Sequence, residues 1–116
     1  SIYLSLPKVK GGSRAAWFSY PILVKRTAPF KKEELVSFLE SRGIETRPIM
    51  AGNFTRQPAA YLYDFSISGG LANTEQIHSS AFLIGTHAGI GEEERTCVAS
   101  AFNEFFKRYQ RRKSQL

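Results

Sequence analysis

Residues 43–58 read GIETRPIMAGNFTRQP, and this stretch decides how the chain is organised. We expect a helix to end at Gly43, a short strand to span 44–48, and a loop to follow directly. Within residues 46–57 the stretch holds two arginines, two threonines, one asparagine and one glutamine. Arginine presents a planar fork to phosphate or carboxylate, and the amides suit sugar hydroxyls or base edges. The loop is therefore predicted to bind an anionic, hydroxyl-rich ligand.

Strand and helix patterns alternate on both sides of this stretch. Aromatic and β-branched residues make 17–26 (WFSYPILVKR) typical of a strand, and Pro21 places part of it at an edge or bulge. The full prediction is strands at 17–26, 44–48 and 82–86, helices at 31–42, 73–81 and 92–111, and a short helix near 59–63. We expect an α/β (α+β) fold, with a small three- to four-stranded, mostly antiparallel sheet and helices packed on one face.

Signals at the helix ends differ in strength. Asn73 is a good N-cap, and Gln76 three residues later completes a capping-box pattern. Lys31 is a poor N-cap, so the preceding helix carries no clear start signal.

Cys97, on the last helix, is expected to pack as a small apolar residue.

Length and composition indicate one folded domain of 116 residues, 42% of them hydrophobic. No apolar run approaches the ~20 residues of a membrane span. One cysteine and two widely spaced histidines give neither an internal disulfide nor metal-site spacing. This composition fits a cytoplasmic setting. The chain opens with Ser1 and not Met, which suggests a fragment of a longer protein.

The formal net charge of +6 has two interpretations. Five basic residues gather near the end of the chain: Lys107, Arg108, Arg111, Arg112 and Lys113. Such a tail can bind nucleic acid or an anionic membrane surface. The same residues suit a solvated helix end, and no aromatic residues are interleaved to stack on bases. The solvated helix end is therefore the favoured interpretation.

The candidate binding residues also have structural interpretations. Arg47 suits an ion pair with Glu45 or Asp64 as well as it suits a ligand. Asn53 follows a glycine, so it is also a natural turn residue. Arg56 has no carboxylate within seven residues along the chain, which favours a ligand role.

The two histidines differ in their surroundings. His87 follows a predicted strand in a turn, a common position for site residues, whereas His78 lies within a predicted helix. His87 is therefore kept as a weaker candidate, and His78 is interpreted as a surface or half-buried residue.

Three runs resemble the C-terminal part of the DegT/StrS family of nucleotide-sugar aminotransferases: LP…GGS…WFSYPILV, KKEELVSFLESRGIETRPIMAGNFTRQPA and FLIGTHAGIGEEE. The resemblance covers about residues 6–106. The AGNFTRQP run is most similar to the family's branch of CDP-4-keto-6-deoxyglucose 3-dehydratases, which serve lipopolysaccharide biosynthesis. The ELVSFLESRGIETRP part resembles the family as a whole.

The resemblance implies a C-terminal small domain of aspartate-aminotransferase fold type I, with 1–16 arriving from a missing large domain and 17–116 forming the small domain. It implies PLP or its amine form, PMP, bound mainly by that large domain, together with the catalytic Lys of an aminotransferase or His of a dehydratase. One cysteine cannot hold the iron–sulfur cluster of the dehydratase branch, so any cluster lies upstream or is absent. It also implies that the parent enzyme is a homodimer and that this fragment alone is inactive.

For the site, the resemblance implies a nucleotide-sugar substrate. Arg47 and Arg56 are expected to meet the diphosphate or cofactor phosphate, and Asn53 and Gln57 the sugar hydroxyls, with His87 as the weaker candidate. Three alternatives stay open: the small domain of an aminotransferase, a basic nucleic-acid-binding α/β module, and a purely structural or dimerising domain.

Overall fold

The computed structural model describes the backbone of residues 1–113 and the side chains of residues 1–110. Within these residues it contains one four-stranded sheet, three α-helices and two short 3₁₀ helices. In chain order the elements are β1 (Leu4–Ser5), β2 (Ser19–Val24), α1 (Lys32–Ser41), β3 (Thr46–Pro48), η1 (Phe54–Arg56), η2 (Pro58–Leu62), α2 (Ala72–Ser80), β4 (Ala81–Gly85) and α3 (Glu92–Lys113). The expected strands and helices are all confirmed, with shifts of a few residues at most.

The sheet runs in the order β1-β2-β4-β3, and every pairing among the described residues is antiparallel. This confirms the predicted sheet. Pro21 lies opposite Leu83 of β4, while β1 pairs with β2 only at Leu23 and Val24. The outer side of β2 at Pro21 therefore has no strand partner in the described part of the chain. That position tolerates a residue without an N–H donor, as the sequence predicted.

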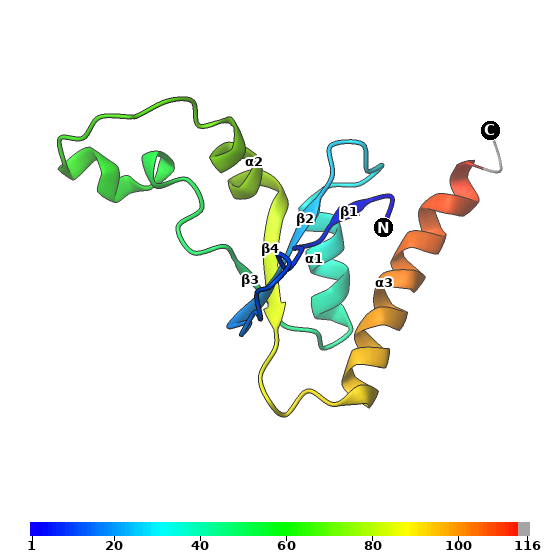
Figure 1. Cartoon of the computed structure of the whole chain (residues 1–116). Helices are drawn as coiled ribbons and strands as arrows, with labels where there is room; N and C mark the ends of the chain where they lie inside the picture. The colour runs from blue at the N-terminus through cyan, green and yellow to red at the C-terminus, as the bar shows by residue number, and fades with distance from the viewer. Residues whose placement is uncertain (114–116) are drawn as a thin grey trace.

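α1 and α3 lie on one side of the sheet, whereas the chain between β3 and α2 extends on the other (Figure 1). Alternate strand residues point toward the two helices, and Ile22, Val24 and Phe82 are only 2–3% exposed. Leu35 and Leu39 of α1 are 0% exposed, so the predicted helical stripe is the core face of that helix. The core thus lies between the sheet and these two helices.

Aromatic rings fill the space between the end of β1, α1 and α3. Phe30 packs edge-on against Phe105 with ring centroids 4.9 Å apart, and Phe38 lies 5.3 Å from the same ring. Tyr3 meets Phe30 at 5.5 Å. Aromatic pairs in these geometries stabilise a core beyond the apolar area they bury.

Both ends of α1 are held by local hydrogen bonds. The Lys31 N–H donates to Oε1 of Glu34 at 2.9 Å, so the side chain three residues on compensates for a poor N-cap residue. At the other end Gly43 has φ +75°, which confirms its predicted place just after the helix. The Ile44 N–H then returns to the Leu39 carbonyl at 3.0 Å. The chain therefore enters β3 after almost no loop.

Two features near the N-terminus and α2 were missed or misplaced. β1 was not expected, because a two-residue strand shows no periodicity, yet Leu4 is 6% exposed and pairs with Val24. The proposed N-cap at Asn73 is wrong: α2 begins at Ala72, and Leu71 occupies the cap position without a side-chain hydrogen bond. The reason is that the Glu75 N–H already bonds to the Leu71 carbonyl at 2.8 Å, which starts the helix earlier.

Cys97 is exposed, so its expected packing in the core is wrong. Arg42, just after α1, pairs with Glu104 of α3. The turns of α3 from residue 92 to residue 100 therefore precede the part of the helix that packs beside α1, and none of these residues is buried, whereas Ala101 is 6% exposed. Cys97 lies in those turns.

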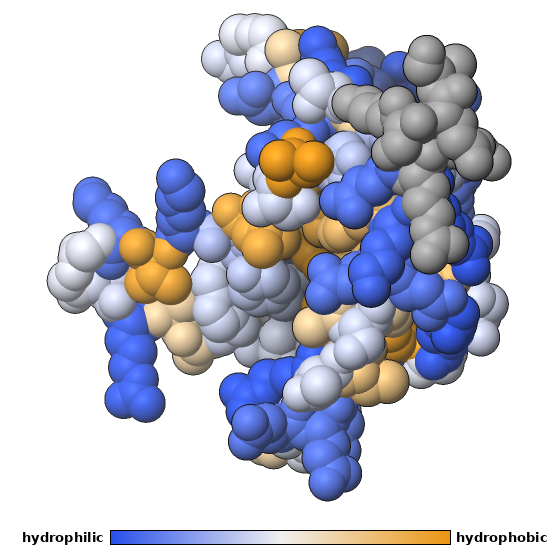
Figure 2. Space-filling view, turned by 90° about the vertical axis from the view of Figure 1, so that its right-hand side faces the viewer, coloured by the Kyte–Doolittle hydropathy of each residue, from blue (hydrophilic) through white to orange (hydrophobic). Residues whose placement is uncertain are grey.

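The outer face of α3 is hydrophilic in the view of Figure 2, which also shows the segment between β1 and β2 extending sideways. Arg108 ion-pairs with Glu104 at 3.7 Å and lies 4.4 Å from the centroid of the Phe38 ring. Of the basic cluster, the side chains of Arg111, Arg112 and Lys113 lie outside the described residues. Within the described residues, no helix combines the length and hydrophobicity that a bilayer crossing requires.

Candidate functional site

The predicted binding loop belongs to a long connection between β3 and α2, which projects from the sheet on the side away from α3 (Figure 1). Two short 3₁₀ helices, η1 and η2, give this connection its only regular structure in the described chain. The short helix expected near 59–63 is η2, in 3₁₀ form. The connection then runs back to α2, whose side chains hold the loop.

Asn53 is the centre of the loop and is only 4% exposed. Its Oδ1 accepts from the Thr55 N–H at 3.0 Å and from the Thr55 hydroxyl at 2.7 Å. Its Nδ2 donates to Oε2 of Glu75 at 3.0 Å, and its own N–H donates to Nδ1 of His78 at 3.1 Å. Asn53 therefore caps η1 and ties the loop to two residues of α2.

Arg56 makes a two-point ion pair with Glu75. Its Nε donates to Oε2 at 2.9 Å, and its Nη2 lies 2.8 Å from Oε1. Glu75 lies 19 residues from Arg56 in the sequence, so it was not identified as a partner of Arg56 from the sequence. The hydrogen bond from Asn53 is the main cause that lowers the pKa of Glu75; desolvation opposes it, and the charge of Arg56 adds to it. Glu75 thus remains an ionised anchor for both loop residues.

The backbone of the loop is tightly folded. Gly52 has φ +62°, and a Cβ added there would lie 2.3 Å from Nδ1 of His78. Met50 also has positive φ, +44°, which is uncommon for a residue with a side chain, and that side chain is 84% exposed. Gln57 closes the loop, since its Nε2 donates to the Ala51 carbonyl at 2.7 Å. The loop is held in one shape by its own contacts and by α2.

Arg47 lies before the loop on β3, opposite Leu83 of β4. Its neighbours on β3 pair with the core-facing residues Phe82 and Ile84, so alternation turns Arg47 to the face that α1 and α3 leave uncovered. The Arg47 guanidinium is paired with Glu45, one of the two partners considered from sequence, and the side chain is 74% exposed.

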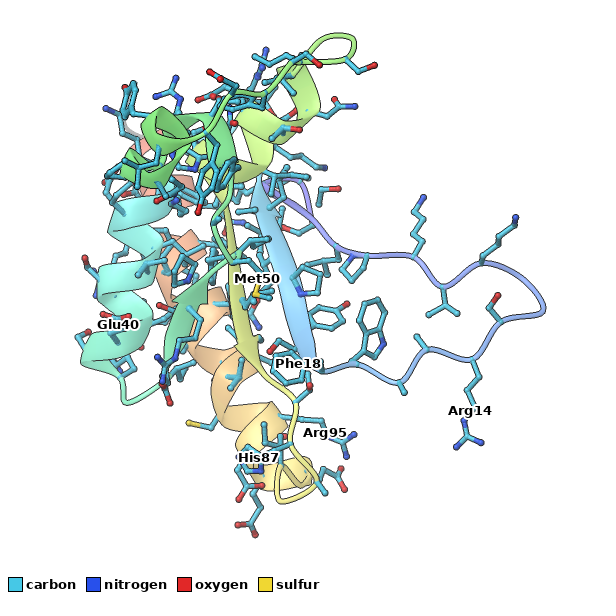
Figure 3. The ribbon with its side chains drawn as sticks, turned by 90° about the vertical axis from the view of Figure 1, so that its left-hand side faces the viewer. Arg14, Phe18, Glu40, Met50, His87 and Arg95 are labelled. Carbon is cyan, nitrogen blue, oxygen red and sulfur yellow. The ribbon has the colours of Figure 1, made fainter. Side chains whose placement is uncertain are left out.

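His87 lies apart from the other candidates, beyond the opposite end of β4 from the loop. In Figure 3 it lies near Arg95 at one end of the molecule, whereas Met50 lies over the sheet. Its Nδ1 accepts from the Gly89 N–H at 3.1 Å, which builds a tight turn before α3. The structure therefore gathers Asn53, Arg56 and Gln57, with Arg47 on the adjacent strand, and leaves His87 separate.

Sequence reasoning missed Glu75, and it interpreted His78 only as a surface or half-buried residue. Both face the loop from α2, because positions three apart share one side of a helix. The three-residue spacing of Glu75 and His78 can be read from the sequence. Their partners in the loop, 19 or more residues away, cannot. The loop and the rest of the connection expose several large apolar side chains: Met50, Phe54, Tyr61, Leu62, Tyr63, Phe65 and Ile67.

A family model described as the DegT/DnrJ/EryC1/StrS aminotransferase family matches residues 3–103, nearly the whole chain. The chain belongs to the DegT/DnrJ/EryC1/StrS family. The match includes every strand and the loop with its α2 contacts. The family resemblance inferred from the three sequence runs is confirmed.

Two curated relatives are similar to this DegT/DnrJ/EryC1/StrS chain over most of its length. The lipopolysaccharide biosynthesis protein RfbH of Salmonella typhimurium is 38% identical over 104 residues, which are 90% of this chain and 24% of RfbH. The GDP-4-keto-6-deoxy-D-mannose 3-dehydratase of Yersinia pseudotuberculosis is 31% identical over 73% of this chain and 21% of its own length. The chain thus spans about a quarter of the length of these relatives.

Solved structures of the family share the fold. A GDP-4-keto-6-deoxymannose-3-dehydratase with a trapped PLP-glutamate geminal diamine gives a TM-score of 0.74 at 25% identity, over 85% of this chain and 26% of that one. A DegT/DnrJ/EryC1/StrS aminotransferase from Brucella abortus gives a TM-score of 0.73 at 21% identity, over 90% and 26%. The aminotransferase-type fold expected from the resemblance is confirmed.

Proposed function

We propose that this chain is the C-terminal part of a PLP-dependent nucleotide-sugar 3-dehydratase that acts in deoxysugar or lipopolysaccharide biosynthesis. The observation that carries the proposal is the 38% identity to RfbH over 90% of the chain, with 3-dehydratases among its other relatives. In this proposal residues 17–116 form the small domain, and residues 1–16 arrive from a large domain and add strand β1 to the sheet. The runner-up is the small domain of a nucleotide-sugar aminotransferase, since the family includes both kinds of enzyme.

The task proposed for this chain is to hold the nucleotide sugar with the loop after β3. Arg56 and Arg47 meet negative charge on the diphosphate or cofactor phosphate. Gln57 commits one N–H to a loop contact at 2.7 Å and retains a second N–H for a sugar hydroxyl. Asn53 is a weaker candidate for such a contact, because it is only 4% exposed and already donates to Glu75 at 3.0 Å. His87 stays a weaker candidate, because 3-dehydratase substrates would have to reach it from the other end of β4.

The loop offers few free donors for a bound PLP. One N–H of each loop amide is used within the chain, and one edge of the Arg56 guanidinium is paired with Glu75. In this proposal PLP or PMP, which supplies the electron sink when bound, and the catalytic Lys or His belong to the rest of the enzyme. An iron–sulfur cluster would likewise take its ligands from outside this chain, because one cysteine cannot hold it.

The parent enzyme is further proposed to be a cytoplasmic homodimer. Exposed apolar residues such as Tyr61 and Leu62, 87% and 79% exposed, fit a surface that another domain or subunit covers. A nucleic-acid partner is not favoured in this proposal, and among the described basic residues of α3 Arg108 is engaged with Glu104 and Phe38.

The test is the ultraviolet–visible spectrum of the purified full-length protein, with and without CDP-4-keto-6-deoxyglucose or GDP-4-keto-6-deoxy-D-mannose. A cofactor band that shifts on addition of one of these sugars supports the proposal and identifies the nucleotide. A full-length protein with no cofactor band, even after addition of PLP, contradicts it.

A further inference from the structure

One carboxylate on α2 holds both polar side chains at the centre of the loop. Oε2 of Glu75 accepts from Nδ2 of Asn53 at 3.0 Å and from Nε of Arg56 at 2.9 Å, while Oε1 meets Nη2 of Arg56 at 2.8 Å. The two oxygens thus receive three donors.

The pairing uses one edge of the Arg56 guanidinium and leaves the other available. Nε and Nη2 face Glu75, so both N–H groups of Nη1 and the second N–H of Nη2 point away from the carboxylate. The Arg56 side chain is 59% exposed. Because Glu75 already holds the Arg56 guanidinium in one orientation, the side chain loses less conformational entropy on binding a phosphate than an unpaired arginine does.

The backbone of the loop is fixed to the same helix at a second point. Nδ1 of His78 accepts the Asn53 N–H at 3.1 Å, three residues along α2 from Glu75. Gly52 approaches that imidazole too closely for a side chain. Glu75 and His78 therefore hold the loop at two points of one helix, and Glu75 also orients the Arg56 side chain.

We propose that Glu75 is a positioning residue of the nucleotide-sugar site. It orients the free edge of the Arg56 guanidinium toward the diphosphate of the substrate, and it does so without contacting the substrate itself. This inference rests on the proposed function and extends it to a residue outside the loop. Because Glu75 also neutralises one positive charge, the loop selects a diphosphate by the direction of its donors and not by an excess of charge.

The experiment compares the full-length enzyme with Glu75→Ala and Glu75→Gln variants, using the nucleotide sugar that the wild-type enzyme converts. Glu93→Gln is the matched control, since it removes an exposed carboxylate from the first turn of α3. Steady-state kinetics give KM and kcat separately. Hydrogen–deuterium exchange, without substrate, reports on residues 50–58 and on α1 as an internal reference.

We expect Glu75→Ala to raise KM about tenfold, the scale on which a charge-assisted contact acts, while kcat stays within twofold. Glu75→Gln keeps one acceptor and should raise KM less. Exchange should accelerate in residues 50–58 and stay unchanged in α1, and Glu93→Gln should resemble wild type in every measurement.

Each other outcome overturns the positioning role. Unchanged exchange in residues 50–58 shows that Glu75 does not order the loop. Faster exchange with unchanged KM shows that the order of the loop does not serve the substrate. A fall in kcat as large as the rise in KM, together with faster exchange in α1, shows general destabilisation. A wild-type enzyme that converts no nucleotide sugar contradicts the proposed function itself, before any variant is compared.

Discussion

A methyl group at Gly52 would lie 2.3 Å from Nδ1 of His78, well inside van der Waals contact. Gly52 also has φ +62°, a conformation that side chains rarely adopt. The close packing of Gly52 against His78 therefore holds the loop against the last turn of α2, which lies 26 residues away in the sequence. This contact is the tightest that an added side chain would make at any glycine of the described chain.

Gly52→Ala should release the loop from α2. The left-handed backbone alone costs ~1–2 kcal/mol with a side chain present, and the methyl group must also displace the imidazole that accepts the Asn53 N–H. Hydrogen–deuterium exchange should show faster exchange at residues 50–57.

Gly11→Ala is the matched control for that substitution. It has open space around it and no positive φ, so its exchange should equal wild type. Loop exchange that is equally slow in Gly52→Ala and Gly11→Ala would show that the contact with His78 is not needed.

Leu39→Ala should destabilise the folded chain by ~2–5 kcal/mol, because it leaves a cavity between α1 and the sheet. Leu39 is 0% exposed. Leu62→Ala makes the same chemical change at a residue that is 79% exposed, and it should change stability by less than ~0.5 kcal/mol. Urea unfolding of the three proteins measures both values, and equal midpoints for the two variants would contradict the assigned core.

Low pH should weaken the contacts of Glu75 with Asn53 and Arg56 that hold the loop. Its pKa is lowered from the ordinary value of 4.5, mainly by the hydrogen bond from Asn53. The contacts of the carboxylate therefore contribute fully above 4.5, and their contribution is lost as the pH falls through the lowered folded-state pKa. A carbon-13 NMR titration of the Glu75 carboxyl should give a midpoint below the ordinary glutamate pKa of 4.5. A midpoint at or above that value contradicts the network.

Arg56→Ala in the full-length enzyme should weaken binding of the nucleotide sugar by ~1.5–3 kcal/mol, as expected for loss of a hydrogen bond to a charged group. Arg56→Lys keeps the charge but not the fork, so it should recover only part of that loss. Isothermal titration with the nucleoside diphosphate measures the difference. Full recovery by lysine would mean that charge alone matters, and unchanged affinity in both variants would remove Arg56 from the site.

Local patterns were enough to predict most of the fold. The stripe of Leu35 and Leu39 marked α1, Gly43 marked its end, and Pro21 marked an open strand edge, because each depends on residues adjacent in sequence. β1 was missed because two residues carry no period. Cys97 was misjudged because the pattern of α3 does not reveal where its neighbouring helix ends.

The candidate site was predictable in composition but not in its partners. The run from Asn53 to Gln57 was identified from its donors, and the structure places these residues in one loop. The partner of Arg56 was not, since Glu75 reaches it only through the fold. Tertiary pairing of this kind leaves no trace in local sequence, and so the residues that hold a site are harder to predict than those that line it.

The central claim is that the chain serves a nucleotide-sugar 3-dehydratase, and mass spectrometry of the product tests it most directly. The full-length enzyme, supplied with at least equimolar PMP as the source of the two electrons and with CDP-4-keto-6-deoxyglucose or GDP-4-keto-6-deoxy-D-mannose, should yield a sugar that has lost the oxygen at C3. A product that has gained an amino group instead would assign the chain to an aminotransferase. Unchanged substrate in every combination would contradict the claim.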